Sequence, residues 1–277
     1  MDALGRDRRS SSGAIGERAL RASRVFLEST PHEDEDKATT LVVRAMQRLA
    51  SRQSSMRLLR GLAERVAESL PSRGGGSDRS DDSRAGQRLM SLEAERTSSR
   101  VRMSGRAMAV WGDRPARVVT LSDSSEVLAV LLRAHKEGRI ERVLVLESLS
   151  GGEGRTMAAR LRREGVAVRT VPDSFAYRSV EAADMVLIGA DSVWPDGSTL
   201  AKVGSAALAL AAHALDRPFY VTCDSLKVIP VSEAPPASRR RPSRLFEPVP
   251  ARHVTRLLTE LGVWRPAELA RRLRVTR

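Results

Sequence analysis

Asp191 is the first residue whose setting suggests chemistry, because it follows the apolar run MVLIG at residues 185–189. Such a run is typical of a buried parallel strand, and open parallel sheets bind ligands beyond the carboxyl ends of their strands. Burial at that edge raises the pKa of a carboxyl group towards neutrality, so Asp191 could act as a general acid or base. The structural alternative is that Asp191 caps a neighbouring turn or pairs with Lys202.

The same rule selects other loops that follow apolar runs. They lie at residues 122–124, 147–155 and 172–174. In the first loop, we expect Asp123 to cap the next helix, with Glu126 at the third helical position. Together with Ser124 and Gly189, Asp123 forms the part of this edge that we expect to bind a ligand.

A glycine-rich turn, GGEGR at residues 151–155, could bind a phosphate group. Its glycines, Gly154 among them, let backbone N–H groups approach an anion at a helix N-terminus, and Arg155 adds a fixed charge. Alternatively, the glycines only make a tight turn. Lys202 opens an apolar helix and is either a phosphate contact or a solvated residue. The turn matches neither GxGxxG nor a Walker loop, which argues against a dinucleotide or ATP-hydrolysing site.

Metal, cofactor and membrane chemistry find no support in the sequence. Its four histidines are scattered, and it contains no CxxC or HxxxH spacing, so we predict neither a metal nor a cofactor. Cys223 is the only cysteine, which excludes an internal disulfide framework. No apolar run reaches the roughly 18 residues of a membrane span, and the first 18 residues lack a secretory signal. We therefore predict a cytoplasmic protein with no membrane partner.

Short apolar strands alternate with helical patterns in the second half of the chain. Strands are predicted at residues 118–121, 143–147, 166–171, 185–189 and 219–222, and helices at 125–135, 154–163 and 203–215. This alternation predicts a Rossmann-like parallel sheet with helices on both faces, following a helical N-terminal domain. The fold class is therefore α/β.

The first half reads as helices at residues 15–28, 36–50, 56–70 and 87–109. Helical spacing places Val25, Phe26 and Leu41 on apolar faces there. The predicted organisation is a disordered segment at 1–12, a helical domain at 13–110 with a flexible segment at 72–84, the Rossmann-like domain at 116–263 and a basic tail at 264–277.

Positive charge is concentrated near the C-terminus. Residues 238–277 hold 11 arginines and 3 glutamates, which accounts for +8 of the net charge of +13. Such a segment can bind phosphate backbones or acidic partners, or it can simply solubilise the surface.

Several ordered segments resemble one protein family. VLIGADSVWPDGSTLAKVGSAALALAAHALDRPFYVTCDSLKV, residues 186–228, is similar to the family's signature, and residues 118–131, 146–168 and 246–263 resemble its other motifs in order. The family groups the alpha, beta and delta subunits of translation initiation factor 2B with methylthioribose-1-phosphate isomerase and ribose-1,5-bisphosphate isomerase. QSSMRLLRGLAERVAE, residues 53–68, resembles the helical N-terminal domain of the factor's subunits.

The resemblance implies two functional classes. In the isomerases, a cysteine and the aspartate of Gly-Ala-Asp form the catalytic pair; here Asp191 remains, but Ser122 stands at the cysteine position. A serine hydroxyl has a far higher pKa than a thiol, so it is a poor acid or base without a helper. Ala201 and Leu149 replace two polar residues of the pattern, whereas Gly154, Arg155, Lys202 and Gly204 persist.

These departures favour a non-catalytic protein like initiation factor 2B, acting in subunit assembly or translation-related regulation, with sugar-phosphate or nucleotide binding. The partners implied are further copies of the chain, in a homodimer or higher oligomer, and a translation GTPase. One alternative is an aldose–ketose sugar-phosphate isomerase that uses Asp191. Another is an RNA- or ribosome-associated protein that binds nucleic acid through its basic C-terminus.

Overall fold

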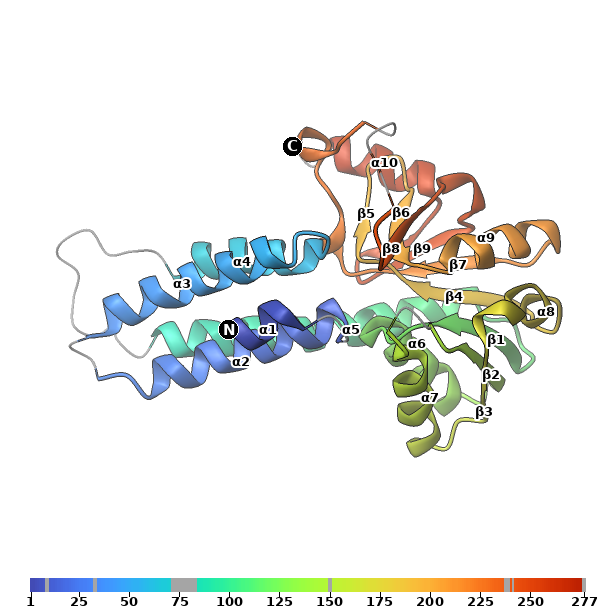
Figure 1. The fold of residues 1–277 in the computed structure, drawn as a ribbon, viewed down its shortest axis with the longest axis horizontal. Helices are drawn as coiled ribbons and strands as arrows, with labels where there is room; N and C mark the ends of the chain where they lie inside the picture. The colour runs from blue at the N-terminus through green and yellow to red at the C-terminus, as the bar shows by residue number, and fades with distance from the viewer. Residues whose placement is uncertain are drawn as a thin grey trace. The chain divides into compact units, whose positions relative to one another are not determined.

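The computed structural model describes residues 1–7, 10–31, 34–70, 84–148, 151–236, 240 and 242–275. The chain divides into two compact units, Met1–Ser99 and Arg100–Arg277 (Figure 1). This division lies inside the long helix α5, Arg84–Ala107, whereas the sequence places the domain boundary between residues 110 and 116. The predicted flexible segment at 72–84 lies outside the described residues, apart from Arg84.

The N-terminal unit consists of helices whose apolar side chains recur every three or four residues. They are α1 (Asp2–Arg6), α2 (Ser12–Glu28), α3 (Glu35–Arg52), α4 (Arg57–Ser69) and the first part of α5. The helices predicted near these positions are confirmed. Val25 and Phe26 are nevertheless exposed, because the buried stripe of α2 runs instead through Ser23 and Leu27. Leu41 is exposed too, because α3 buries Ala38, Val42 and Met46.

Residues 2–6 form helix α1, although the sequence indicates disorder over 1–12. The reason is a long-range contact from the end of α3. The side-chain amide of Gln53 donates to the carbonyl oxygens of Leu4, at 3.2 Å, and Asp7, at 2.6 Å, so it occupies carbonyl groups at the end of this short helix. A prediction from local composition cannot take into account a hydrogen bond from a side chain 46 residues further along the chain.

The C-terminal unit is built on a seven-stranded sheet in the order β10-β9-β7-β4-β1-β2-β3. Its strands are β1 (Ala116–Leu121), β2 (Ile140–Leu146), β3 (Val168–Val171), β4 (Met185–Gly189), β7 (Phe219–Thr222), β9 (Arg256–Thr259) and β10 (Gly262–Trp264). Each strand pair from β3 to β9 is parallel, and β10 adds an antiparallel edge. The predicted α/β class is thereby confirmed.

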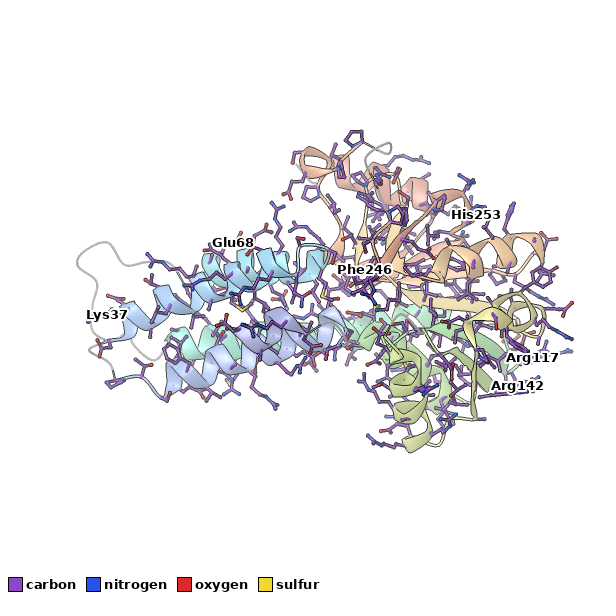
Figure 2. All side chains as sticks on the ribbon, in the orientation of Figure 1. Lys37, Glu68, Arg117, Arg142, Phe246 and His253 are labelled. Carbon is purple, nitrogen blue, oxygen red and sulfur yellow. The ribbon has the colours of Figure 1, made fainter. Side chains whose placement is uncertain are left out.

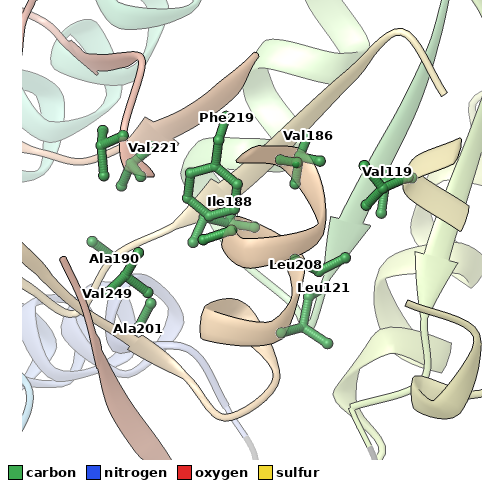
Figure 3. Close-up of a cluster of buried hydrophobic side chains, with 14 of the residues drawn as sticks. Val119, Leu121, Val186, Ile188, Ala190, Ala201, Leu208, Phe219, Val221 and Val249 are labelled. Atoms are coloured by element: carbon green, nitrogen blue, oxygen red, sulfur yellow. The ribbon is translucent and has the colours of Figure 1, made fainter. Parts of the chain in front are cut away.

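Both faces of this sheet are covered, because successive strand residues point to opposite sides and both sets are apolar. On one side, Val119, Ile188 and Phe219 pack with Leu208 of helix α9, Ser205–Ala214 (Figure 3). On the other side, alternate strand residues pack against α6 (Ser125–Lys136) and α7 (Glu153–Arg163). The remaining helices are α8, Ala176–Glu181, and α10, Pro266–Val275, and the latter lies where the sequence predicts a basic tail.

A small second sheet, not predicted from the sequence, carries one of the candidate site residues. It consists of β5 (Ser192–Val193), β6 (Thr199–Lys202) and β8 (Phe246–Val249), all antiparallel. Lys202 therefore ends a strand instead of opening a helix, since α9 begins only at Ser205. Short 3-10 turns include η3 (Met108–Val110), η4 (Asp173–Phe175), η5 (Ser225–Lys227), η6 (Val231–Glu233) and η8 (Ala251–His253).

Candidate functional site

The strand order places the candidate residues where ligands bind in folds of this class. From β1 the chain continues to β2 and β3 on one side, and then returns to β4 on the other side of β1. The switch point is therefore the crevice beyond the carboxyl ends of β1 and β4. Ser122 follows β1, and Gly189 and Asp191 come at the end of the adjacent strand β4, so the structure brings these predicted residues to one edge.

The loop after β1 is organised differently from the prediction. Ser124, not Asp123, caps α6, because its hydroxyl accepts the Val127 N–H at 3.3 Å. Asp123 instead accepts a hydrogen bond from Arg160 of α7 at 3.0 Å. Burial raises the pKa of the Asp123 carboxyl above its usual value, although the Arg160 guanidinium opposes that shift. Ser122 has a left-handed backbone, with φ of +67°, which few non-glycine residues adopt.

Gly189 permits a close approach between this loop and the end of β4. A Cβ atom at Gly189 would lie 2.5 Å from the Ser124 hydroxyl oxygen, so no larger residue fits without movement. Beyond it, the backbone N–H of Asp191 donates to the Leu200 carbonyl oxygen at 2.8 Å. That bond links the edge of the main sheet to the small sheet that carries Lys202.

Residues 151–155 make a tight turn whose backbone donors are largely used within the turn. The N–H groups of Gly152 and Gly154 donate to the carbonyl oxygens of Ser148 and Glu147, and that of Arg155 donates to Gly152. The Arg155 guanidinium is exposed and pairs with Glu147 at 3.0 Å. Few of the N–H groups predicted to bind a phosphate therefore remain available. Leu149 of the preceding loop lies outside the described residues.

Lys202 forms a nearly buried ion pair with Glu153, a residue that the sequence analysis did not select. The Lys202 Nζ lies 2.5 Å from Glu153 Oε1, and the two side chains are 12% and 6% exposed. The other oxygen, Glu153 Oε2, is buried and has no hydrogen-bond partner among the described residues. Lys202 also lies over the ring of Phe246, labelled in Figure 2. The ion pair that Lys202 makes in the structure is thus with Glu153, whereas the sequence offers Asp191 as its partner.

A second buried ion pair lies beneath the same edge. Lys227 Nζ is 3.2 Å from Glu126 Oε2, with side-chain exposures of 3% and 4%. Burial alone would lower the pKa of Lys227, but Glu126, Asp191 and Asp224 together raise it, so the ammonium is charged at neutral pH. Sequence reasoning missed Lys227, for which the only local signal is the apolar strand β7 that ends five residues before it.

The single thiol is unavailable for chemistry at this edge. Cys223 follows β7 and is completely buried, and burial raises the pKa of its thiol well above the usual value. A thiolate is therefore absent at neutral pH. Within the described residues, no group of three or more histidine, cysteine or acidic side chains could hold a metal ion. No helix in the described parts of the chain is both long and apolar enough to cross a membrane.

Comparisons with known proteins agree with this arrangement. The sequence model of the Initiation factor 2 subunit family matches residues 8–266. The chain is 32% identical over 113 residues to ribose 1,5-bisphosphate isomerase of Archaeoglobus fulgidus, covering 41% of this chain and 36% of that protein. It is 29% identical to translation initiation factor eIF2B subunit alpha of Dictyostelium discoideum, covering 53% and 54%. The chain thus spans between a third and about half of these relatives.

Solved structures share the fold along nearly the whole chain. The translation initiation factor eIF-2B of Pyrococcus horikoshii superposes with a TM-score of 0.79 at 21% identity, covering 96% of this chain and 95% of that one. The 5-methylthioribose 1-phosphate isomerase of the same organism also gives 0.79 at 17% identity, covering 100% and 86%. The same fold thus occurs in a factor subunit and in an isomerase.

Proposed function

The chain belongs to the Initiation factor 2 subunit family, and on this premise we propose that it is a non-catalytic member acting in subunit assembly or translation-related regulation. The relatives include sugar-phosphate isomerases as well as initiation factor subunits, so membership alone leaves both classes open. A cytoplasmic location and a translation GTPase partner belong to the same proposal. The ion pair between Lys202 and Glu153 carries it.

This ion pair fills an anion site with the chain's own carboxylate. Glu153 lies in the first turn of α7, where the helix dipole favours negative charge, and its carboxylate contacts the ammonium of Lys202. A phosphate group that binds Lys202 must displace Glu153 or accept its repulsion in a poorly solvated place. This arrangement supports weak phosphate binding and argues against a site built to hold a bisphosphate substrate.

The missing second catalytic group supports the same proposal. An aldose–ketose isomerisation moves a proton between two carbons, and it needs a group that gains a proton and one that returns it. Asp191 and the alcohol Ser122 follow the carboxyl ends of the adjacent parallel strands β4 and β1, whereas the thiol of Cys223 is buried after β7. Lys227, which interacts electrostatically with Asp191, is buried and paired with Glu126.

The proposal is tested with the full chain in two measurements. Ribose 1,5-bisphosphate and methylthioribose 1-phosphate should give no ketose product. Turnover that disappears in the Asp191→Asn variant would overturn the proposal. In the second measurement, thermal shifts with the same sugar phosphates and with nucleotides are compared with each variant's own unliganded Tm.

Glu153→Gln should tighten phosphate binding by on the order of tenfold, because it removes the competing charge. Lys202→Gln should abolish binding at this edge of the sheet, and Lys136→Gln, which changes an exposed lysine at the end of α6, should leave it unaltered. Equal affinity in the wild type and in Glu153→Gln would show that the carboxylate does not compete, and would remove the observation on which the proposal depends.

The basic C-terminus gives little support to the nucleic-acid alternative. Arg240 pairs with Asp196 at 2.6 Å and lies over the ring of Trp194. Arg272 lies over the ring of Trp264. These guanidinium groups stabilise the chain itself and are not an open row of charges for a phosphate backbone. Arg239 and Arg241 lie outside the described residues.

A further inference from the structure

A second cleft lies at the opposite end of the main sheet from the candidate site. It has a volume of about 360 Å³ and is bordered by the last turn of α9, the turn that leads into β7, and η8 before β9. Because β7 and β9 are parallel and the cleft residues precede both strands, the cleft lies at their N-terminal ends. The switch point is at the carboxyl ends, so the two sites are distinct.

Four side chains that carry or can gain positive charge line this cleft: His213, Arg217, Arg252 and His253. The rings of His213 and His253 are in edge-to-face contact, with centroids 5.0 Å apart (His253 is labelled in Figure 2). Asp216 is the only carboxylate among the lining residues. The cleft is therefore cationic, and becomes more so when the histidines are protonated.

Several polar atoms of this cluster lack a hydrogen-bond partner in the described part of the chain. Both ring nitrogens of His253, and Nε of Arg217, are buried without a hydrogen-bond partner among the described residues. Asp184 interacts electrostatically with Arg217, but its carboxylate is held by Arg117. Unpartnered buried donors cost free energy, and native proteins rarely leave them without a reason. An acceptor from outside the chain would supply the missing partner.

We propose that this cleft binds an oxyanion, such as sulfate, phosphate or the phosphate group of a phosphomonoester, through Arg217, Arg252 and the two histidines. Guanidinium groups donate to such anions in a planar fork, and protonated imidazoles add charged donors. The exposed His213 and Arg252 border the opening, and the turn before β7 brings Arg217 beside them. Asp216 opposes the anion and limits its affinity.

Proton uptake accompanies binding at this site. The pKa of His253 is below its usual value, first because of burial and then because of the positive charges of Arg252 and His213. A bound dianion reverses the electrostatic part of this shift, so the histidine binds a proton together with the ligand. Binding is consequently stronger at lower pH. Sulfate is the suitable probe because its own charge does not change in this range.

Calorimetric titration of the full chain with sulfate at constant ionic strength tests the proposal. Affinity should be several-fold higher at about pH 6 than at about pH 8, and a rise of one unit in the pKa of His253 on binding sets the upper limit of this change at about tenfold. A second titration with glycerol phosphate distinguishes a free oxyanion from a phosphomonoester as the ligand. If glycerol phosphate binds as tightly as sulfate, the ligand is a free anion; if it binds more tightly, the ligand is a phosphomonoester. Absence of sulfate binding at both pH values would overturn the proposal.

Variants identify the site and separate it from the switch point. Arg252→Gln and His213→Gln should each weaken sulfate binding by tenfold or more, and Asp216→Asn should tighten it; asparagine adopts the φ of +51° found there as readily as aspartate. Arg142→Gln, at an exposed position labelled in Figure 2, should have no effect. Unchanged binding in the first three variants would refute this site and leave the role of Glu153 untouched, whereas sulfate binding that is lost only in Lys202→Gln would place the anion at the switch point instead.

Discussion

At the scale of single residues, two buried side chains of opposite charge, Lys227 and Glu126, neutralise each other near the candidate site. The side chains of Lys227 and Glu126 are almost completely buried. The hydroxyl of Ser124, the residue that caps α6, donates a hydrogen bond to the Glu126 carboxylate as well. This chain of contacts joins the turn after β7 to the loop after β1 across the end of β4. A buried pair of this kind stabilises little compared with apolar residues, but removing one partner is costly because the other charge stays buried.

Lys227→Met should therefore lower the free energy of unfolding by about 3–5 kcal/mol, since it leaves the carboxylate of Glu126 unpaired. Adding Glu126→Gln to this variant should recover most of the loss. Urea denaturation of the C-terminal unit within the full chain measures both changes. The control Lys136→Met, at an exposed position, should stay within about 0.5 kcal/mol of the wild type. A Lys227→Met variant as stable as this control would contradict the argument.

At the scale of elements, one ion pair fixes how β1 lies beside β4. The Asp184 carboxylate accepts from the Arg117 backbone N–H at 2.8 Å and from its guanidinium at 2.7 Å, and the Asp184 N–H donates to the Arg117 carbonyl oxygen (Arg117 is labelled in Figure 2). These bonds lie at the start of the two strands whose far ends form the switch point. The Arg117 guanidinium, as a hydrogen-bond donor, lowers the pKa of Asp184 below its usual value.

Asp184→Asn should lower the Tm at neutral pH, and this difference should vanish in acid. A carboxyl group whose pKa is lower in the folded than in the unfolded state stabilises the protein above the unfolded pKa, about 3.9, and loses this effect as the pH falls through the folded value. Thermal unfolding of both proteins between about pH 7 and pH 3 measures the difference. A Tm difference that stays constant over this range would show that the ionised carboxylate is not what orders the strands.

Much of this architecture could be predicted from the sequence, because each buried strand appears as a run of apolar residues. When such strands pair in parallel, their carboxyl ends lie at the same edge of the sheet. In this way the sequence places Ser122 and Asp191 after the carboxyl ends of two strands, which are neighbours in the structure. The cap at Ser124 was missed by one residue, since Asp123 is an equally good capping type and the choice depends on backbone geometry. The pairing of Lys202 with Glu153 joins residues 49 apart through a small sheet whose strands are too short to give a pattern.

At the scale of the whole molecule, helix α9 indicates how copies of the chain could associate. Its sequence, SAALALAAHA, contains no acidic residue, lysine or arginine, and Leu210 on its outer side is 55% exposed. A helix that is apolar all round is normally buried. The apolar part of this outer side, around Leu210, can pair with the same part of a second copy around a two-fold axis.

We therefore predict that the full chain is a dimer or larger oligomer, and that Leu210→Glu shifts it towards monomer because a charge would be buried at the interface. Light scattering after size-exclusion chromatography measures the mass of each form. Leu261→Glu is the matched control, since Leu261 is also exposed but lies in the turn between β9 and β10. If both variants keep the wild-type mass, α9 is not the contact. If the wild-type chain is a monomer, assembly of this chain with itself is excluded, whereas sulfate binding in the cleft before β7 would be unaffected.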